Sequence, residues 1–144
     1  MTVPARVSLV TLGVANLETS TAFYEALGWQ KSSVSNDDVS FFKTSDCVLS
    51  LYPFAALAKD AGIDAGDTPH VGSVALAINV ETESEVEQIL ADAVQAGATL
   101  TKAATRANWG GYSGYFADPT GHLWEVCYNP GFPLDEHGSV VLPA

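Results

Sequence analysis

The chain has 144 residues, of which 47% are hydrophobic and 16% are charged, a composition that excludes disorder and predicts one compact domain. Its net charge of −11 argues against polyanionic partners, so we expect no binding to nucleic acid or to an anionic membrane surface. No apolar run approaches the roughly 18 residues of a membrane span, and the first residues do not resemble a secretory leader, so we expect a cytoplasmic protein.

The first part of the chain predicts a strand, a helix and three further strands. Alternation of apolar residues from Val7 to Val14 indicates the first strand. Asn16 is a suitable N-cap for a helix over residues 17–27, and Gly28 is a suitable end for it. The next three strands are predicted over residues 29–34, 39–44 and 47–52.

The same order of elements is repeated after a linker rich in Gly, Asp and Pro. A short helix is predicted over residues 53–61. Apolar alternation over 73–80 indicates a strand, and Thr82 to Glu85 fits the capping box of a helix that ends at Gly97. The last three strands are predicted over residues 98–104, 112–117 and 123–128.

This repeat predicts an α+β fold built from two tandem βαβββ units. The units would form an open, cup-shaped half-barrel with one helix per unit on its outer face. We divide the single domain into unit one, the linker, unit two and a C-terminal tail, at residues 6–53, 54–72, 73–128 and 129–144.

Residues 116–126 combine a hairpin with a carboxylate among apolar neighbours. Asp118, Pro119 and Gly121 suit successive positions of a tight turn. Glu125 then falls in the middle of a β-prone segment that we expect to be buried on at least one face. A carboxylate in that place makes Glu125 the first candidate for a functional residue.

Two segments resemble the vicinal-oxygen-chelate superfamily, which includes glyoxalase I, bleomycin and fosfomycin resistance proteins and extradiol dioxygenases. Residues 12–29, LGVANLETSTAFYEALGW, resemble its opening strand and helix, and residues 118–125, DPTGHLWE, resemble its closing hairpin. Together with the repeat, the resemblance covers residues 6–128. It implies the cup-shaped fold, a small-molecule ligand and a homodimer, but the fold hosts many chemistries.

In metal-using members, the resemblance implies, each unit holds the ion with one residue from its first strand and one from its last. Strand parity places apolar sets toward the helices, namely Val10, Leu12, Val14, Leu49, Leu51, Val74, Leu76, Ile78, Trp124 and Val126. The equivalent positions in the cup are then Leu9, Ser50, Ser73 and Glu125. Only Glu125 is a usual ligand, so we expect no tightly held metal and no other cofactor. His70, His122 and His137 are expected to be solvated or structural.

The expected lining of the cup contains hydroxyl, aromatic and charged residues, namely Leu9, Thr11, Ser50, Ser73, Arg106, Trp109, Tyr112 and Glu125. The first predicted function is binding of a small organic molecule, of the sequestration or resistance type. The alternative is an enzyme of the glyoxalase, lyase or dioxygenase kind that uses Glu125 as a general base or a weakly held divalent ion. A third reading is a protein whose ancestral site has decayed.

Overall fold

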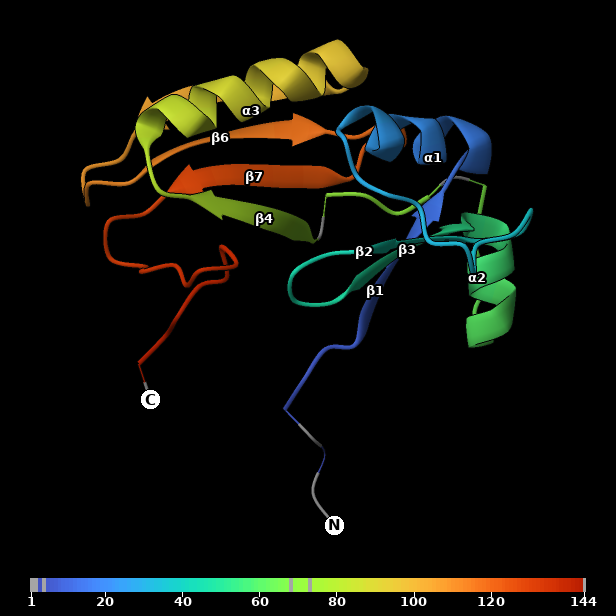
Figure 1. Cartoon of the computed structure of the whole chain (residues 1–144). Coiled ribbons are helices and arrows are strands. Elements are labelled where there is room, and N and C mark those ends of the chain that lie inside the picture. The colour runs from blue at the N-terminus through green and yellow to red at the C-terminus, as the bar shows by residue number, and fades with distance from the viewer. Residues whose placement is uncertain (1–2, 4, 68, 73, 144) are drawn as a thin grey trace.

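The computed structural model describes residues 3, 5–67, 69–72 and 74–143, whose strands form a three-stranded and a four-stranded sheet. Helices α1 (Leu17–Ala26) and α3 (Glu83–Ala96) lie next to each other on the outer side of the sheets (Figure 1). Helix α2 (Phe54–Ala61) lies at the far end of the first sheet, away from α3 (Figure 1). The repeat predicts an open arrangement, and the two sheets indeed do not close into a barrel.

The first sheet has the strand order β1-β3-β2. Its strands are β1 (Leu9–Val14), β2 (Ser40–Lys43) and β3 (Val48–Pro53). Strand β1 pairs with β3 in parallel, and β2 pairs with β3 antiparallel. The predicted cap of α1 is confirmed, since the side chain of Asn16 accepts the N–H of Thr19 at 2.9 Å.

The strand predicted over residues 29–34 is wrong. Only an isolated bridge between Lys31 and Phe42 forms there. A turn begins at Ser32, whose carbonyl accepts the N–H of Ser35 at 3.1 Å and whose hydroxyl accepts the N–H of Val34 at 3.3 Å. A serine hydroxyl that bonds to the local backbone offers it an alternative to a strand ladder, and here the alternative prevails.

The second sheet has the order β4-β7-β6-β5. Its strands are β4 (Ala75–Val80), β5 (Thr99–Arg106), β6 (Tyr112–Ala117) and β7 (Leu123–Tyr128). Strand β5 extends two residues beyond the predicted 98–104, because after two irregularities it pairs Thr105 with Ser113 and Arg106 with Tyr112. The capping box of α3 is present, with the Glu85 N–H donating to the Thr82 hydroxyl at 3.1 Å.

A single apolar core joins the two units beneath α1 and α3. Its buried members come from both helices and both sheets and include Leu12, Val14, Phe23, Tyr24, Leu49, Leu51, Val86, Leu90, Phe116, Trp124 and Val126. These residues confirm the predicted parity of β1, β3 and β7. Val74 departs from the prediction: it precedes β4 and is 66% exposed. The side of the sheets that faces away from α1 and α3 is called the cup face below.

Helix α2 packs closely against β1. A Cβ added at Gly13 would lie 3.0 Å from the Cβ of Phe54, so the absence of a side chain at Gly13 permits this approach.

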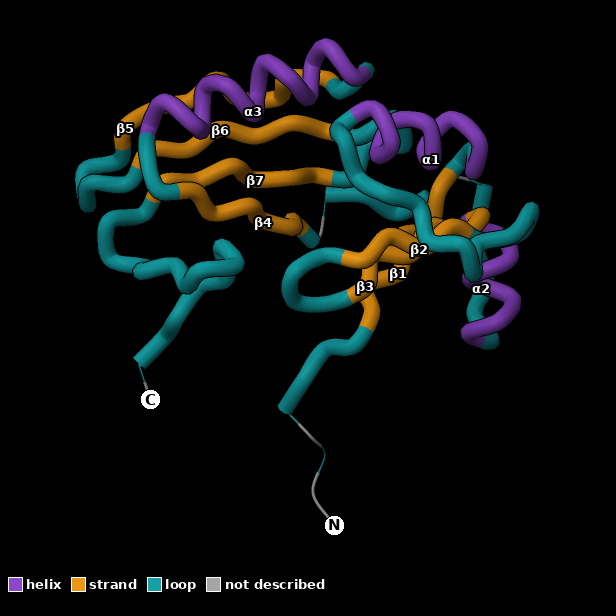
Figure 2. Tube along the Cα trace, in the orientation of Figure 1, coloured by secondary structure: helices purple, strands orange, loops and turns teal. Residues whose placement is uncertain are grey.

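Figure 2 shows the connection from β2 to β3 and the tail after β7 as two loops near β4. In the part of the chain that is described, no helix combines the length and apolar character needed to cross a bilayer.

Candidate functional site

Glu125 lies on the cup face of the second sheet and is bound by a tyrosine. In the register, Glu125 stands between Ala77 of β4 and Tyr115 of β6. The Tyr115 hydroxyl donates a hydrogen bond of 2.8 Å to Oε2 of Glu125. Ala77 is exposed and small, so the carboxylate is open on the side of β4. The phenol therefore orients a carboxylate that keeps further capacity to accept hydrogen bonds.

The electrostatics of this pair favour a protonated phenol beside the carboxylate. The hydrogen bond to Glu125, followed by burial, raises the pKa of Tyr115 above its ordinary value. Two residues along β7, burial raises the pKa of the Cys127 thiol, and the Glu125 carboxylate adds to that rise. Tyr115 thus acts as a hydrogen-bond donor, and the thiol remains neutral at physiological pH.

On the first sheet the cup face carries a pair of hydroxyl groups. The side chains of Thr11 and Ser50, which are register partners on β1 and β3, are hydrogen-bonded at 2.8 Å. Ser50 is buried, whereas Leu9, at the start of β1, is 49% exposed. Thr11, Ser50 and Leu9 therefore lie where parity predicts them, on the face opposite α1.

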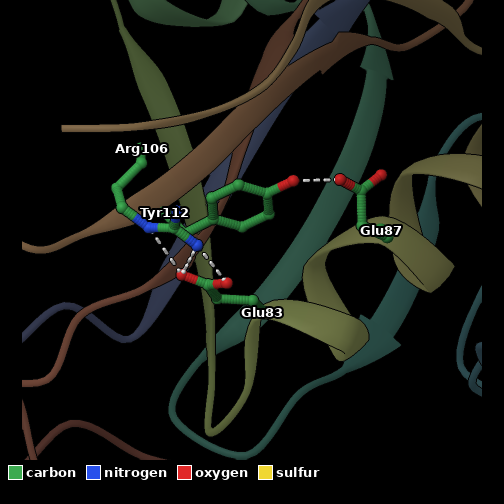
Figure 3. A network of polar contacts seen from close by, with 4 residues as sticks. All are labelled: Glu83, Glu87, Arg106 and Tyr112. Atoms are coloured by element: carbon green, nitrogen blue, oxygen red, sulfur yellow. Dashed lines mark hydrogen bonds and ion pairs between the residues drawn. The ribbon is translucent and has the colours of Figure 1, made fainter.

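Arg106 and Tyr112 do not belong to the cup. Figure 3 shows that both side chains lie beside α3, where the Arg106 guanidinium forms an ion pair with Glu83 at 2.5 Å. The Tyr112 hydroxyl donates to Glu87 (Figure 3), and the Arg106 guanidinium carbon lies 5.6 Å from the centre of the Tyr112 ring. Tyr112 is on the α3 side because its parity on β6 is opposite to that of Tyr115. The prediction that Arg106 and Tyr112 line the cup is therefore wrong.

Trp109 follows β5 in the connecting loop and is 58% exposed. Its indole covers its own loop, since a Cβ added at Gly111 would lie 1.9 Å from the Trp109 ring. A side chain at position 111 would therefore displace the indole from this place. Ser73, another expected cup residue, lies outside the described residues.

The side chains at the expected ligand positions do not fit a tightly held transition-metal ion. Leu9 has no donor atom, the Ser50 hydroxyl is engaged by Thr11, and Glu125 accepts from Tyr115. Among the residues with described side chains, no group of three or more His, Cys, Asp or Glu is arranged to hold an ion. His122, in the hairpin, lies with Nε2 at 2.7 Å from the carbonyl oxygen of Gly13, in agreement with a structural role.

Two cavities flank the seam between β1 and β4, which are edge strands of separate sheets. The first, called the tail pocket, has a volume of about 400 Å³ and extends from Val10 and Ile78 to the tail at Val140. The second, called the α2 pocket, has about 440 Å³ and is lined by Gly13 and Leu57. Both volumes are within the range of small-molecule sites. Glu125 belongs to neither lining, although its register neighbour Ala77 lines the tail pocket.

Comparison with known proteins identifies the family. The chain belongs to the Glyoxalase/Bleomycin resistance protein/Dioxygenase superfamily, whose model matches residues 6–126. A glyoxalase-related enzyme from Fulvimarina pelagi is 37% identical, with a TM-score of 0.88 over 98% of this chain and 100% of that chain. A comparison with curated proteins found no match.

More distant solved structures share the fold alone. A glyoxalase/bleomycin resistance protein/dioxygenase family enzyme from Burkholderia phytofirmans is 22% identical, with a TM-score of 0.74 over 86% of this chain and 98% of that chain. Lactoylglutathione lyase from Agrobacterium tumefaciens is also 22% identical, with a TM-score of 0.68 over 90% of this chain and 98% of that chain. The predicted resemblance to this superfamily is confirmed.

Sequence reasoning missed Tyr115 as the partner of Glu125. The predicted hairpin contains the signal that identifies this partner. In an antiparallel hairpin, the residue numbers of each opposed pair have the same sum. A turn closed between Asp118 and His122 therefore places Tyr115 opposite Glu125. The predicted lining contains Tyr112 instead, which has the opposite parity on β6 and lies on the α3 side.

Proposed function

We propose that the protein binds a small organic molecule on its cup face, with Glu125 as the group that orients the ligand. The observation that carries this proposal is the hydrogen bond of 2.8 Å from Tyr115 to Glu125. It fixes one carboxylate oxygen on a surface left open by the small side chain of Ala77. A carboxylate that is held rigidly is suited to recognition, because little further ordering is needed when a ligand binds.

The chemistry of the cup favours a ligand with a hydrogen-bond donor or a cationic nitrogen. An ionised carboxylate only accepts hydrogen bonds, and the hydroxyl proton of Tyr115 is already donated to Glu125, so a ligand here must supply the donor. The net charge of −11 supports the same choice, since it attracts cations over distances of about 10 Å at ordinary ionic strength. The exposed hydroxyl of Thr11, held in place by its hydrogen bond to the buried Ser50, offers a further polar contact on the first sheet. Sequestration or resistance is the function that such binding would serve.

The proposal includes binding without a tightly held metal or other cofactor. Its support is the donor set, in which Leu9 and Ser50 replace the charged or imidazole ligands that a transition metal prefers. We expect the melting temperature to be unchanged by chelator and by added Ni²⁺, Zn²⁺, Fe²⁺ or Mn²⁺. Native mass spectrometry that found one ion per chain, removable only with loss of stability, would contradict this part.

The substitution Glu125→Gln tests the site directly. A screen of organic amines by thermal shift should find ligands that stabilise the wild type and that bind the variant about tenfold or more weakly, because a charge-assisted hydrogen bond is lost. Glu87→Gln is the matched control, since Glu87 also accepts a tyrosine hydroxyl but belongs to α3, on the other side of the sheet. Equal ligand profiles for wild type and Glu125→Gln would remove the carboxylate from the site.

The second candidate is an enzyme in which Glu125 acts as a general base. It is favoured by the 37% identity to a protein described as a glyoxalase-related enzyme. Glu125 would remove a proton from a carbon next to a carbonyl, and Tyr115 would hold the carboxylate in place. Incubation with α-hydroxy ketones in D₂O tests this, because proton removal exchanges that hydrogen for deuterium, which NMR detects. Exchange unaffected by Glu125→Gln would exclude this role.

A homodimer is also part of the proposal. Apolar side chains are exposed near the cup and the seam, notably Val7 (66%), Leu9 (49%), Val71 (43%) and Val74 (66%). Contact with a second chain would remove this surface from water and cover the edges of β1 and β4. Light scattering should give twice the monomer mass at micromolar concentration.

We place the protein in the cytoplasm, in keeping with the free thiols of Cys47 and Cys127.

A further inference from the structure

The tail pocket has apolar walls supplied by both sheets. Val10 and Leu49 face it from the first sheet, and Leu76 and Ile78 face it from the second. Two indoles complete the walls, those of Trp29 and Trp124, whose rings meet edge to face with their centres 5.5 Å apart. A cavity of about 400 Å³ between two sheets, with aromatic walls, is suited to a flat organic molecule.

The polar groups of the tail pocket are gathered at its mouth. They come from the turn between β2 and β3, from the end of β4 and from the tail, and include Asp46, Asn79 and His137. Asp46 is the one carboxylate among the residues that line the pocket, and no lysine or arginine is described in the lining. The mouth therefore attracts a positive charge and offers no fixed cation to an anion.

The tail is fastened across this mouth by two hydrogen bonds to the turn between β2 and β3. The Ser139 hydroxyl donates to Oδ1 of Asp46 at 2.5 Å, and the Ser45 hydroxyl donates to the carbonyl oxygen of His137 at 3.2 Å. Asp135 shapes the tail locally, since its carboxylate accepts the N–H groups of His137 and Ser139. The tail is thus a formed turn that rests on the mouth through contacts with exposed side chains.

We propose that the tail pocket is a binding site for a flat aromatic cation. Its rings would lie between the two sheets against Trp29 and Trp124, and its cationic nitrogen would pair with Asp46. The tail covers the bound molecule, and the bond from Ser139 to Asp46 must open for the molecule to enter. Glu125 is not among the residues that line this pocket, although its register neighbour Ala77 is, so the tail pocket adjoins the proposed Glu125 site and differs from it in its charged group, Asp46.

The diaminoacridine proflavine, a planar cation, is the probe for this site. All variants carry Trp109→Phe, which removes the exposed loop indole and leaves Trp29 and Trp124 as the two remaining indoles, whose fluorescence is excited selectively at wavelengths that tyrosine does not absorb. Titration at pH 7 should show saturable quenching of these indoles with one dye per chain. The anionic aromatic dye anilinonaphthalene sulfonate should bind far more weakly, since the mouth carries a carboxylate.

Asp46→Asn should weaken proflavine binding by about tenfold, because a charge-assisted contact is lost. Asp38→Asn is the matched control: Asp38 is exposed and outside the pocket lining, so its removal should change affinity less than about twofold. Ser139→Ala keeps the Asp46 charge and removes the bond from the tail, so dye association in stopped flow should become faster. A melting curve for each variant confirms that it is folded.

A chemical footprint locates the dye. The Cys47 thiol belongs to the pocket lining and Cys127 does not, so bound proflavine should slow alkylation of Cys47 by iodoacetamide and leave Cys127 unaffected. Absence of saturable binding, equal losses with Asp46→Asn and Asp38→Asn, or an unprotected Cys47 would each overturn the proposal. Loss of binding with Glu125→Gln alone would place the dye in the cup, and would overturn this proposal while supporting the other.

Discussion

The hydroxyl of Tyr24 donates a hydrogen bond of 2.8 Å to Oδ2 of Asp118 and so joins helix α1 of the first unit to the hairpin of the second. The same hydroxyl accepts the indole N–H of Trp124 at 3.1 Å. Tyr24 is fully buried, and burial, followed by the nearby Asp118 carboxylate, raises the pKa of its phenol. Asp118 also receives the N–H groups of three hairpin residues, Thr120, Gly121 and His122. The hydrogen bonds among Tyr24, Asp118 and Trp124, called the polar joint below, therefore link the two units inside one core.

Tyr24→Phe tests this joint. The variant leaves Oδ2 of Asp118 and the Trp124 indole N–H without a partner, so we expect the free energy of unfolding to fall by about 1–3 kcal/mol. Urea unfolding measures the change. Tyr112→Phe is the control, since its hydroxyl bond to Glu87 is exposed and should contribute less than about 1 kcal/mol. Equal effects of the two substitutions would mean that the buried joint has no special importance.

Gly114→Ala tests the contact between β6 and α3. A Cβ at this position would lie 2.6 Å from Cδ1 of Leu90 and 2.8 Å from the carbonyl oxygen of Lys102, which belongs to the neighbouring strand. Because that oxygen is part of the backbone, relief requires movement of β5, and we expect a loss of about 1–3 kcal/mol in thermal or urea unfolding. Ser113→Ala, on the opposite face of the same strand, should have a much smaller effect. A neutral Gly114→Ala would show that the sheet yields easily here.

The pair of Tyr115 and Glu125 predicts a dependence of stability on alkaline pH. The hydrogen bond to Glu125 raises the pKa of Tyr115 in the folded state, so the folded protein holds this proton more tightly than the unfolded chain. The contribution is complete below the unfolded pKa of about 10 and is lost as pH rises through the folded value. The stability advantage of wild type over Tyr115→Phe should therefore be constant at neutral pH and shrink above pH 10. An advantage that grows with alkaline pH has the wrong sign for this account.

The lowered pKa of Asp135 predicts that the turn of the tail is destabilised in acid. The backbone N–H groups of Ser139 and His137 lower the pKa of this carboxyl, so its stabilising effect is present above the unfolded pKa of about 3.9 and is lost as pH falls through the folded value. The amide signals of His137 and Ser139 in NMR spectra should move with a midpoint below about 3.9.

Proteolysis at neutral pH gives a second measurement on the tail. Asp135→Ala should increase cleavage near Leu134 and Val140 by thermolysin, because the turn that joins these residues loses its side-chain acceptor. Glu136→Ala, next to it in the same turn, is the control, since the Glu136 side chain is 85% exposed. Equal cleavage of the two variants would show that Asp135 does not hold the turn.

The sequence by itself determined the repeat of two units, the limits of β6 and β7, the caps of α1 and α3 and the superfamily. These features depend on local patterns, since residues such as Asn16 and Thr82 act within one turn of the backbone and alternation marks which face of a strand is apolar. The cup-face positions of Thr11 and Ser50 followed from the same parity, and their mutual hydrogen bond agrees with it.

Only the tertiary structure decided which side chains meet. The sequence predicts Arg106 and Tyr112 in the cup, yet they pair with Glu83 and Glu87, because β5 continues past its predicted end and α3 lies over that face. The partner of Glu125 and the tail pocket depend on contacts between residues far apart in the chain, such as the 93 positions between Asp46 and Ser139. Such contacts are set by how sheets and loops pack, and no local pattern of residues encodes them.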